Sequence, residues 1–320
     1  MLKLSLIIFF NLLFLPLYMS FFIIGFFVTF VPLFPIVTAH KNAKERLELT
    51  GLKNRIFVAT IFLNYVFYLF EIVFFSPLRL RFAPLPPNFV LEDFLKEVRA
   101  SYPEKTPQGF TFLAAHVANL EYQTVPLIRA FETMRQEKIL IIAKHAPLKV
   151  IDKILIWHRL RPGLGMIWKD KNLFATMNDS IDKGCSLCLI ADQKPKKNGV
   201  FIRFFGKFAA FPTAGVKFCA EKKSIFIYVF AHRIIPGWVN ISFECGKNLH
   251  LAQKTTQANS TYSSTQHLIL GEIYPNTTID EKEEMAQKEL AYYTSWLENN
   301  IKKYPTQWCW DYGKWSREPS

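Results

Sequence analysis

A histidine and a glutamate five positions apart follow a short apolar run in the middle third of the chain. The run covers residues 110–115, and His116 and Glu121 come after it. If His116 lies in the turn between a buried strand and a helix, a carboxylate in the first turns of that helix can reach back to the imidazole. Such a pair can act as a general base, and the helix start offers amide donors for developing negative charge. A histidine and an acid at this spacing also occur at ordinary solvated helix starts.

A second polar pair, Asp192 and Gln193, ends another apolar run, residues 186–191. In an open α/β sheet, ligands bind beyond the carboxyl ends of the strands, so this pair is a candidate for the same site. The segment that follows, residues 199–206, is apolar and closes on a glycine. A turn acid followed by a hairpin is the alternative interpretation.

A third candidate is a basic cluster around Trp157, where Arg159 and Arg161 follow within four residues and Lys144 precedes it. Fixed positive charge of this kind suits phosphate groups or an acidic carrier protein. A solvated basic helix face has the same composition.

A fourth segment, residues 304–319, carries three tryptophans that are expected to pack on the body or to lie at a membrane interface.

The composition narrows the class of protein. Of 320 residues, 50% are hydrophobic and 31 are Phe, which excludes a disordered chain, whereas 20% charged residues are too many for a polytopic transporter. A net charge of +13 indicates an anionic partner such as lipid headgroups, nucleic acid or an acidic protein.

Cys185 and Cys188 form a pair that no second pair completes, so buried strand thiols are favoured over a metal or redox site. The five scattered cysteines suggest a reducing compartment.

The amino-terminal region is apolar enough to enter a membrane. Residues 4–39 contain no charge, and 36 helical residues would span roughly 54 Å, whereas a bilayer core needs about 20 residues. We therefore expect a spanning helix with an interfacial or kinked extension, broken at Pro16, Pro32 or Pro35. A cleaved signal peptide fits less well, because its apolar core is shorter. Basic residues 40–55 follow, which predicts a cytoplasmic body.

A second apolar stretch, residues 56–78, contains Asn64 and Glu71. It is either a second spanning helix or a helix that packs on the body at the membrane surface. The second interpretation is favoured, because a glutamate in mid-bilayer is costly and a second crossing would return the body to the outside.

Beyond residue 88, strand-like and helix-like segments alternate, which predicts an α/β fold with a mostly parallel central sheet flanked by helices. The predicted strands are residues 110–115, 139–143, 186–191 and 224–231. The predicted helices are residues 89–102, 117–135, 148–161, 173–183, 214–222 and 281–304. The expected organisation is an anchor at residues 1–39, a helical membrane-proximal region at 40–88 and an α/β domain at 89–320.

Taken in order, these segments resemble the bacterial lipid A biosynthesis late acyltransferases over nearly the whole chain. The resemblance rests on Asn64-Tyr65, Glu71, His116 with Glu121, residues 157–161, Asp192-Gln193, residues 204–206, residues 305–308 and residues 317–319. The chain departs from the family pattern at Val117, Ala118 and Leu120, has Lys144 where an arginine is expected, and reads Asp311-Tyr312-Gly313 near its end.

The resemblance implies an enzyme that moves a fatty acyl chain from acyl carrier protein, or from acyl-CoA, to a hydroxyl of a lipid A precursor or related glycolipid. His116 would be the general base and Glu121 would orient it. The implied substrate-binding positions are Asn119, Lys144, Arg159, Arg161, Asp192, Gln193, Arg203, Phe205 and Gly206. No cofactor, metal or nucleic acid is expected. The implied partners are acyl carrier protein, an anionic lipid acceptor and the bacterial inner membrane, with the catalytic domain on its cytoplasmic face.

Two alternatives stay open at this point. One is the same chemistry on a lysophospholipid or another glycolipid. The other is a catalytically inactive protein that binds membrane surfaces, which the altered residues around His116 would allow.

Overall fold

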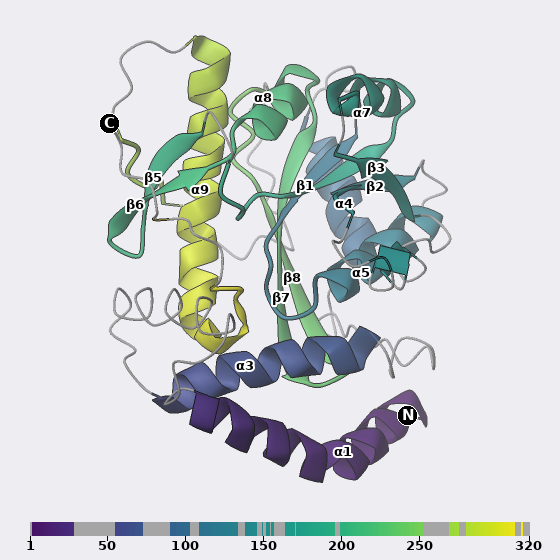
Figure 1. Ribbon diagram of the computed structural model, residues 1–320. Helices are drawn as coiled ribbons and strands as arrows, with labels where there is room; N and C mark the ends of the chain where they lie inside the picture. Colours follow the sequence, from purple (N-terminus) through teal and green to yellow (C-terminus); the bar gives the residue numbers. More distant parts are fainter. Residues whose placement is uncertain are drawn as a thin grey trace.

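The fold is a mixed α/β body with two long apolar helices at its base (Figure 1). The computed structural model describes residues 2–28, 55–72, 90–102, 109–133, 138–145, 149, 152–153, 155–156, 164–169, 171–195, 199–251, 269–274, 280–310 and 315. Residues 40–46, 157–163 and 252–268 lie outside these residues.

The central sheet has the strand order β3-β2-β4-β1-β7-β8 among the described residues. Its strands are β1 (Phe110–Ala114), β2 (Ile139–Ala143), β3 (Leu164–Trp168), β4 (Ser186–Ile190), β7 (Ile225–Ile235) and β8 (Trp238–Cys245). Neighbouring strands run parallel except at β7 and β8, which form an antiparallel hairpin. All five residues of β1 are buried, as expected for a central strand that is covered on both faces. The predicted fold class is confirmed.

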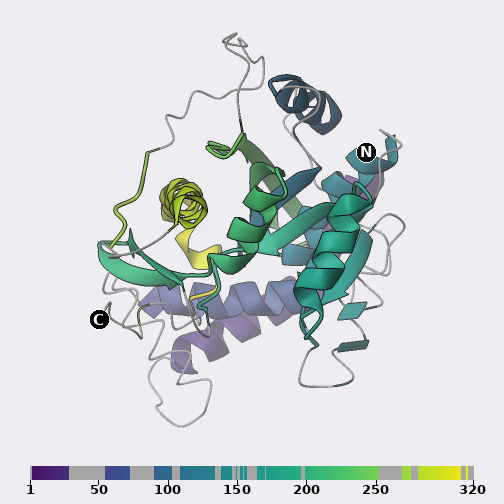
Figure 2. The ribbon, with the colours of Figure 1, turned by 90° about the horizontal axis from the view of Figure 1, so that it is seen from above.

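Helices cover both faces of the sheet (Figure 2). On one face, α4 (Leu91–Ala100) and α5 (Leu120–Thr133) enclose one core cluster. On the other face lie α7 (Leu173–Asp182), α8 (Ala214–Glu221) and the long α9 (Glu281–Lys303), with a second cluster. The pattern of α4 explains its placement: Leu91, Phe94, Leu95 and Val98 recur at helical spacing and are all buried.

A small hairpin of β5 (Val200–Phe204) and β6 (Lys207–Phe211) packs beside α9 (Figure 1). Its two turn residues, Phe205 and Gly206, have φ values of 50° and 78°. Two consecutive left-handed residues make the turn that best matches the twist of a hairpin. The hairpin interpretation of this segment is therefore confirmed.

The two apolar helices lie side by side under the carboxyl end of β7 (Figure 1). They are α1 (Leu2–Val28) and α3 (Arg55–Phe70), and α3 packs between α1 and the body. Within the described residues, one segment, Leu4–Ile24, is long and apolar enough to cross a bilayer. α1 continues through Pro16, so the helix does not end at this candidate break point. Pro32 and Pro35 lie outside the described residues.

Candidate active site

The pairing of the two central strands brings His116 and Asp192 together. β1 and β4 are parallel neighbours, and Ala114 is aligned with Ile190. His116 and Asp192 each lie two residues further along, so both residues lie beyond the carboxyl ends of these two strands. The connection after β1 leaves over the α5 face and the connection after β4 leaves over the α8 face. Such a reversal between adjacent strands is where open α/β sheets form ligand sites.

The carboxylate of Asp192 fixes both the backbone and the ring of His116. Its Oδ2 accepts from the His116 amide at 2.8 Å and from Trp308 Nε1 at 3.0 Å, and its Oδ1 lies 2.7 Å from His116 Nδ1. Asp192 is fully buried, whereas the His116 side chain keeps 19% of its surface exposed. An ionised carboxylate only accepts hydrogen bonds, so Nδ1 carries the proton and Nε2 has a lone pair.

The lone pair on Nε2 faces a second polar side chain, because the amide nitrogen of Gln193 lies 3.2 Å from it. The amide therefore donates to the ring in this state. An imidazole with one nitrogen held by a carboxylate and the other accepting a weak hydrogen bond can take a proton from a hydroxyl that displaces the amide.

A left-handed residue shapes the loop that carries His116, and backbone hydrogen bonds to the carboxyl-terminal segment hold it in place. Ala118 has a φ of 50°, which non-glycine residues rarely adopt, and this turn delays the start of α5 to Leu120. The Ala118 amide donates to the Gln307 carbonyl, and the Cys309 amide donates to the His116 carbonyl, both at 2.9 Å. These contacts make residues 307–309 a structural support of the site.

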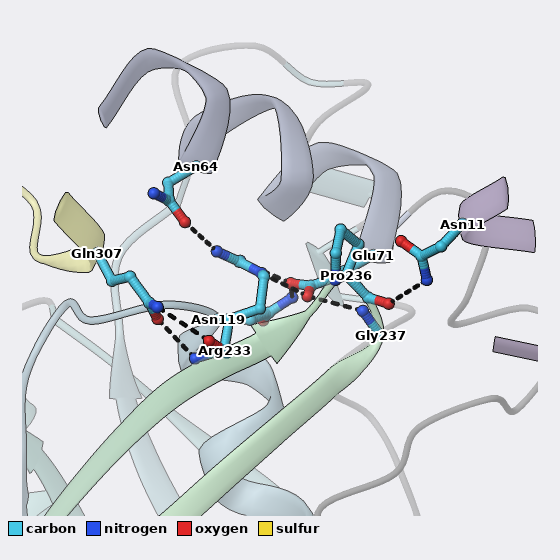
Figure 3. Close-up of polar contacts among 8 residues, drawn as sticks. All are labelled: Asn11, Asn64, Glu71, Asn119, Arg233, Pro236, Gly237 and Gln307. Carbon is cyan, nitrogen blue, oxygen red and sulfur yellow. Dashed lines mark hydrogen bonds and ion pairs between the residues drawn. The ribbon is translucent and has the colours of Figure 1, made fainter. Parts of the chain in front are cut away.

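A buried polar cluster lies beneath this loop (Figure 3). Glu71, at the end of α3, pairs with Arg233 of β7 through Nε–Oε1 at 2.7 Å and Nη2–Oε2 at 2.8 Å. Asn119 donates to Glu71 Oε2 at 2.8 Å, and the Gly237 amide donates to Oε1 at 2.9 Å. We call these four residues the Glu71 cluster. It joins the start of α5 to α3.

Two further contacts extend the cluster to neighbouring elements (Figure 3). Arg233 Nη1 donates to Asn64 Oδ1 at 2.6 Å, and Gln307 pairs with both backbone groups of Arg233. Asn11 of α1 donates to the Pro236 carbonyl at the tip of the β7–β8 hairpin at 2.8 Å. Both apolar helices are thus tied to the element that holds the His116 loop.

Two cavities adjoin His116. The smaller, about 290 Å³, lies between the His116 loop and α3, where Asn64, Tyr65 and Tyr68 line it. The larger, about 690 Å³, follows the carboxyl ends of β2 and β4 towards α7 and α8. His116 and Leu120 line both. The imidazole therefore stands between two spaces, as a reaction that joins two substrates requires.

Comparison with known families decides the class of enzyme. Residues 99–317 match the sequence profile described as bacterial lipid A biosynthesis acyltransferase. The chain belongs to this family. It is therefore an acyltransferase, and the resemblance drawn from the ordered motifs is confirmed. A search among curated proteins finds none that matches the chain.

Three of the site residues predicted for this acyltransferase meet at one point: His116, Asp192 and Gln193. Lys144 follows β2, is exposed, and lies at the rim of the larger cavity. Glu121 is the second residue of α5, and its side chain lies outside the described residues, as do Arg159 and Arg161 altogether.

The other predicted positions are engaged in structural contacts of the acyltransferase. Asn119 is fully buried and belongs to the Glu71 cluster. Arg203 pairs with Glu272 and donates to the Gly206 carbonyl on the hairpin surface. Phe205 packs against Trp308 and Trp310, and its amide donates to Glu298. None of these three residues lines either of the two cavities at His116, and neither does Gly206.

Sequence reasoning did not single out Arg233, which holds the Glu71 cluster together. A signal was available: Arg233 and Glu71 each stand within an apolar run, and burying a lone charge is costly unless an opposite charge meets it. Gln307 and Trp308 belong to the motif at residues 305–308, and the motif alone indicates no role for them. Their roles depend on the packing of the carboxyl-terminal segment on the His116 loop, which is not a local property.

Proposed function

We propose that this acyltransferase moves a fatty acyl chain from the thioester of acyl carrier protein to a hydroxyl of a lipid A precursor, with His116 as the general base. The observation that carries the proposal is the His116–Asp192 pair, with Nε2 facing the space between two cavities.

The proposed reaction needs no covalent enzyme intermediate. Nε2 takes the proton of the acceptor hydroxyl as its oxygen attacks the thioester carbonyl carbon. The carbon–sulfur bond then breaks, and the departing thiolate takes the proton back from the imidazolium. Asp192 stabilises the imidazolium through the 2.7 Å contact to Nδ1. General-base assistance of this kind accelerates a reaction about 10²–10⁴-fold.

Charge supports the proposed partners. Acyl carrier protein is acidic, lipid A precursors carry phosphates, and the chain has a net charge of +13. Lys144 and Lys169 lie at the carboxyl ends of β2 and β3, and both are exposed at the larger cavity. Lysines at this position suit the phosphate of a donor or the acidic surface of its carrier.

The exposed side of α1 supports an anchor in the inner membrane. Only Ile7 and Tyr18 are buried among its residues 4–24. Its exposed large apolar residues are Leu6, Ile8, Phe9, Leu12, Leu13, Leu15, Leu17, Met19, Ile23 and Ile24. A soluble protein rarely exposes so large an apolar surface, whereas lipid covers it without cost. We propose that the body lies on the cytoplasmic side, as the basic residues after the anchor predict.

The experiment measures acyl transfer by the full chain in detergent or vesicles, from acyl carrier protein to a purified lipid A precursor. His116→Ala is expected to lose at least about 10²-fold in rate. His250→Gln is the matched control. His250 binds the carbonyl of Ser224, directly before β7, so it lies at the amino-terminal ends of the strands and away from His116. Unchanged transfer in His116→Ala would rule out the proposed base. Transfer only to a lysophospholipid would replace the acceptor.

A further inference from the structure

The larger cavity has two lobes, one on each face of the sheet. Successive residues of a strand point to opposite faces, so Cys188 and Ile190 line the lobe next to α5, and Leu189 and Ala191 line the other. The lobes meet over the strand ends, where Lys144 and Gln193 lie. We call the second lobe, between α7 and α8, the α7–α8 lobe.

The α7–α8 lobe has apolar walls below the lysines at its rim. Its walls are formed by Leu173, Phe174, Met177, Leu189, Gly215 and Val216. Met177 is fully buried, and Gly215 is in the first turn of α8, where the absence of a side chain leaves the wall open. A Cβ at Gly215 would just touch Leu189 Cδ1, at 3.4 Å, and would meet no other atom within 4 Å, so a larger side chain here would extend into the lobe.

The lobe next to α5 is less suited to a hydrocarbon chain. The polar side chains of Gln123 and Thr124 line it, so a hydrocarbon chain would meet fewer apolar groups there than in the α7–α8 lobe. The smaller cavity is also less suited, because it is under half the size and is lined by the polar side chains of Asn64, Thr306 and Gln307.

We propose that the α7–α8 lobe binds the acyl chain of the donor, a fatty acyl phosphopantetheine thioester, and that Gly215 sets the longest chain accepted. The acceptor then reaches His116 from the smaller cavity beneath α3. The phosphopantetheine arm leaves past the lysines at the rim, Lys144, Lys169 and Lys194. This inference rests on the proposed function and adds the place and the length limit of the acyl chain.

The first test compares kcat/KM for a series of saturated acyl chains in the wild type and in Gly215→Leu. The longest chain that the wild type uses is expected to lose at least about 10-fold, while shorter chains keep their rates. Gly215→Ala should give a smaller shift, and it is compatible with the helix. Thr124→Leu, in the lobe next to α5, should keep the wild-type chain profile. A folded Gly215→Leu variant with the wild-type profile, or a shift in Thr124→Leu alone, would overturn the inference.

The second test does not depend on turnover, so its result is separate from that of the proposed function. A fatty acyl thioester with a photoreactive diazirine at the chain end is presented on acyl carrier protein and, in a parallel arm, on CoA. Cross-links are expected on residues 173–177 and 214–216. Cross-links confined to α5 or α3 would contradict the inference, even if transfer fails.

A separate measurement identifies the acyl donor. If acyl carrier protein is the donor, Lys144→Glu with Lys169→Glu should raise KM more for the acylated carrier than for acyl-CoA.

Discussion

The carboxylate of Glu71 and the guanidinium of Arg233 face each other in a two-pronged ion pair that is almost completely buried, at 0% and 3% exposure of the two side chains. Glu71 comes from the end of α3 and Arg233 from the end of β7, 162 residues later. Asn119 and Gly237 donate to the same carboxylate, so its oxygens are satisfied by four N–H groups. The pair connects α3 to Asn119, which lies three residues beyond His116 and directly before α5.

Removing one member of this pair is expected to destabilise the fold strongly. Glu71→Gln or Arg233→Met leaves the other charge buried without its partner, which typically costs about 3–5 kcal/mol. The double variant Glu71→Leu with Arg233→Met should lose less than the sum of the single variants, because it leaves no lone charge. Chemical unfolding of the solubilised protein measures both. Single variants within about 1 kcal/mol of the wild type would show that the pair is not sealed from water.

The sequence predicts the elements of the body better than their arrangement. Residues 139–143, 173–183 and 214–222 form the expected strand and helices within one residue, because buried strands read as continuous apolar runs and surface helices have a clear period. β3 and β8 were not predicted. Gly165 breaks the apolar run of β3 and so weakens its strand signal, whereas β8 alternates apolar residues with Asn240, Ser242 and Glu244, a pattern that does indicate a half-buried strand.

The partner of His116 could not be predicted from local spacing. Asp192 is 76 residues away, and the contact exists because β4 lies beside β1 in a parallel register. Strand order is a non-local property, so the reasoning favoured Glu121, which is near in sequence. The delayed start of α5 has a local cause that composition does not reveal, namely the left-handed Ala118.

Asp192→Asn tests the carboxylate that holds the imidazole. An amide at this position cannot accept from all three N–H groups, so His116 loses its fixed tautomer and the support for its charged form. Transfer is expected to fall about 10²–10⁴-fold. Rates are measured together with the unfolding midpoint, since Asp192 also accepts from Trp308.

Glu121→Gln is the comparison for Asp192→Asn, because Glu121 is the carboxylate that the spacing predicts. We expect the smaller loss in Glu121→Gln. A larger loss there, with Asp192→Asn still active, would mean that the ring turns to Glu121 when substrate is bound. Trp308→Phe removes one donor to Asp192 and keeps the packing, so its effect on rate should be smaller than that of Asp192→Asn.

Ala118 offers a test of backbone strain beside His116. Its φ of 50° is unfavourable for a residue with a Cβ by about 1–2 kcal/mol, and glycine adopts it freely. Ala118→Gly should therefore raise the unfolding midpoint or leave it unchanged, whereas the β-branched Ala118→Val should lower it. A lower midpoint in Ala118→Gly would indicate that chain entropy outweighs the strain at this turn.

Glu289 makes the stability of the body depend on pH. Burial raises the pKa of its carboxyl to about 7, although Tyr228 Oη at 2.6 Å and the Asn248 amide at 2.8 Å both donate to it. In the unfolded chain a glutamate ionises near pH 4.3. Between these values the folded state holds more protons than the unfolded state, so stability is highest at the acid end and falls as the pH rises towards about 7.

Glu289→Gln removes this titration while keeping a neutral side chain of the same shape. The wild type is expected to lose stability between about pH 5 and about pH 7, at up to about 1.4 kcal/mol per pH unit from this group, and to level off above. The variant should lack that loss. Urea unfolding of both proteins across this range measures the difference. Parallel profiles for the two proteins would mean that Glu289 stays ionised in the fold, with its donors outweighing the cost of burial.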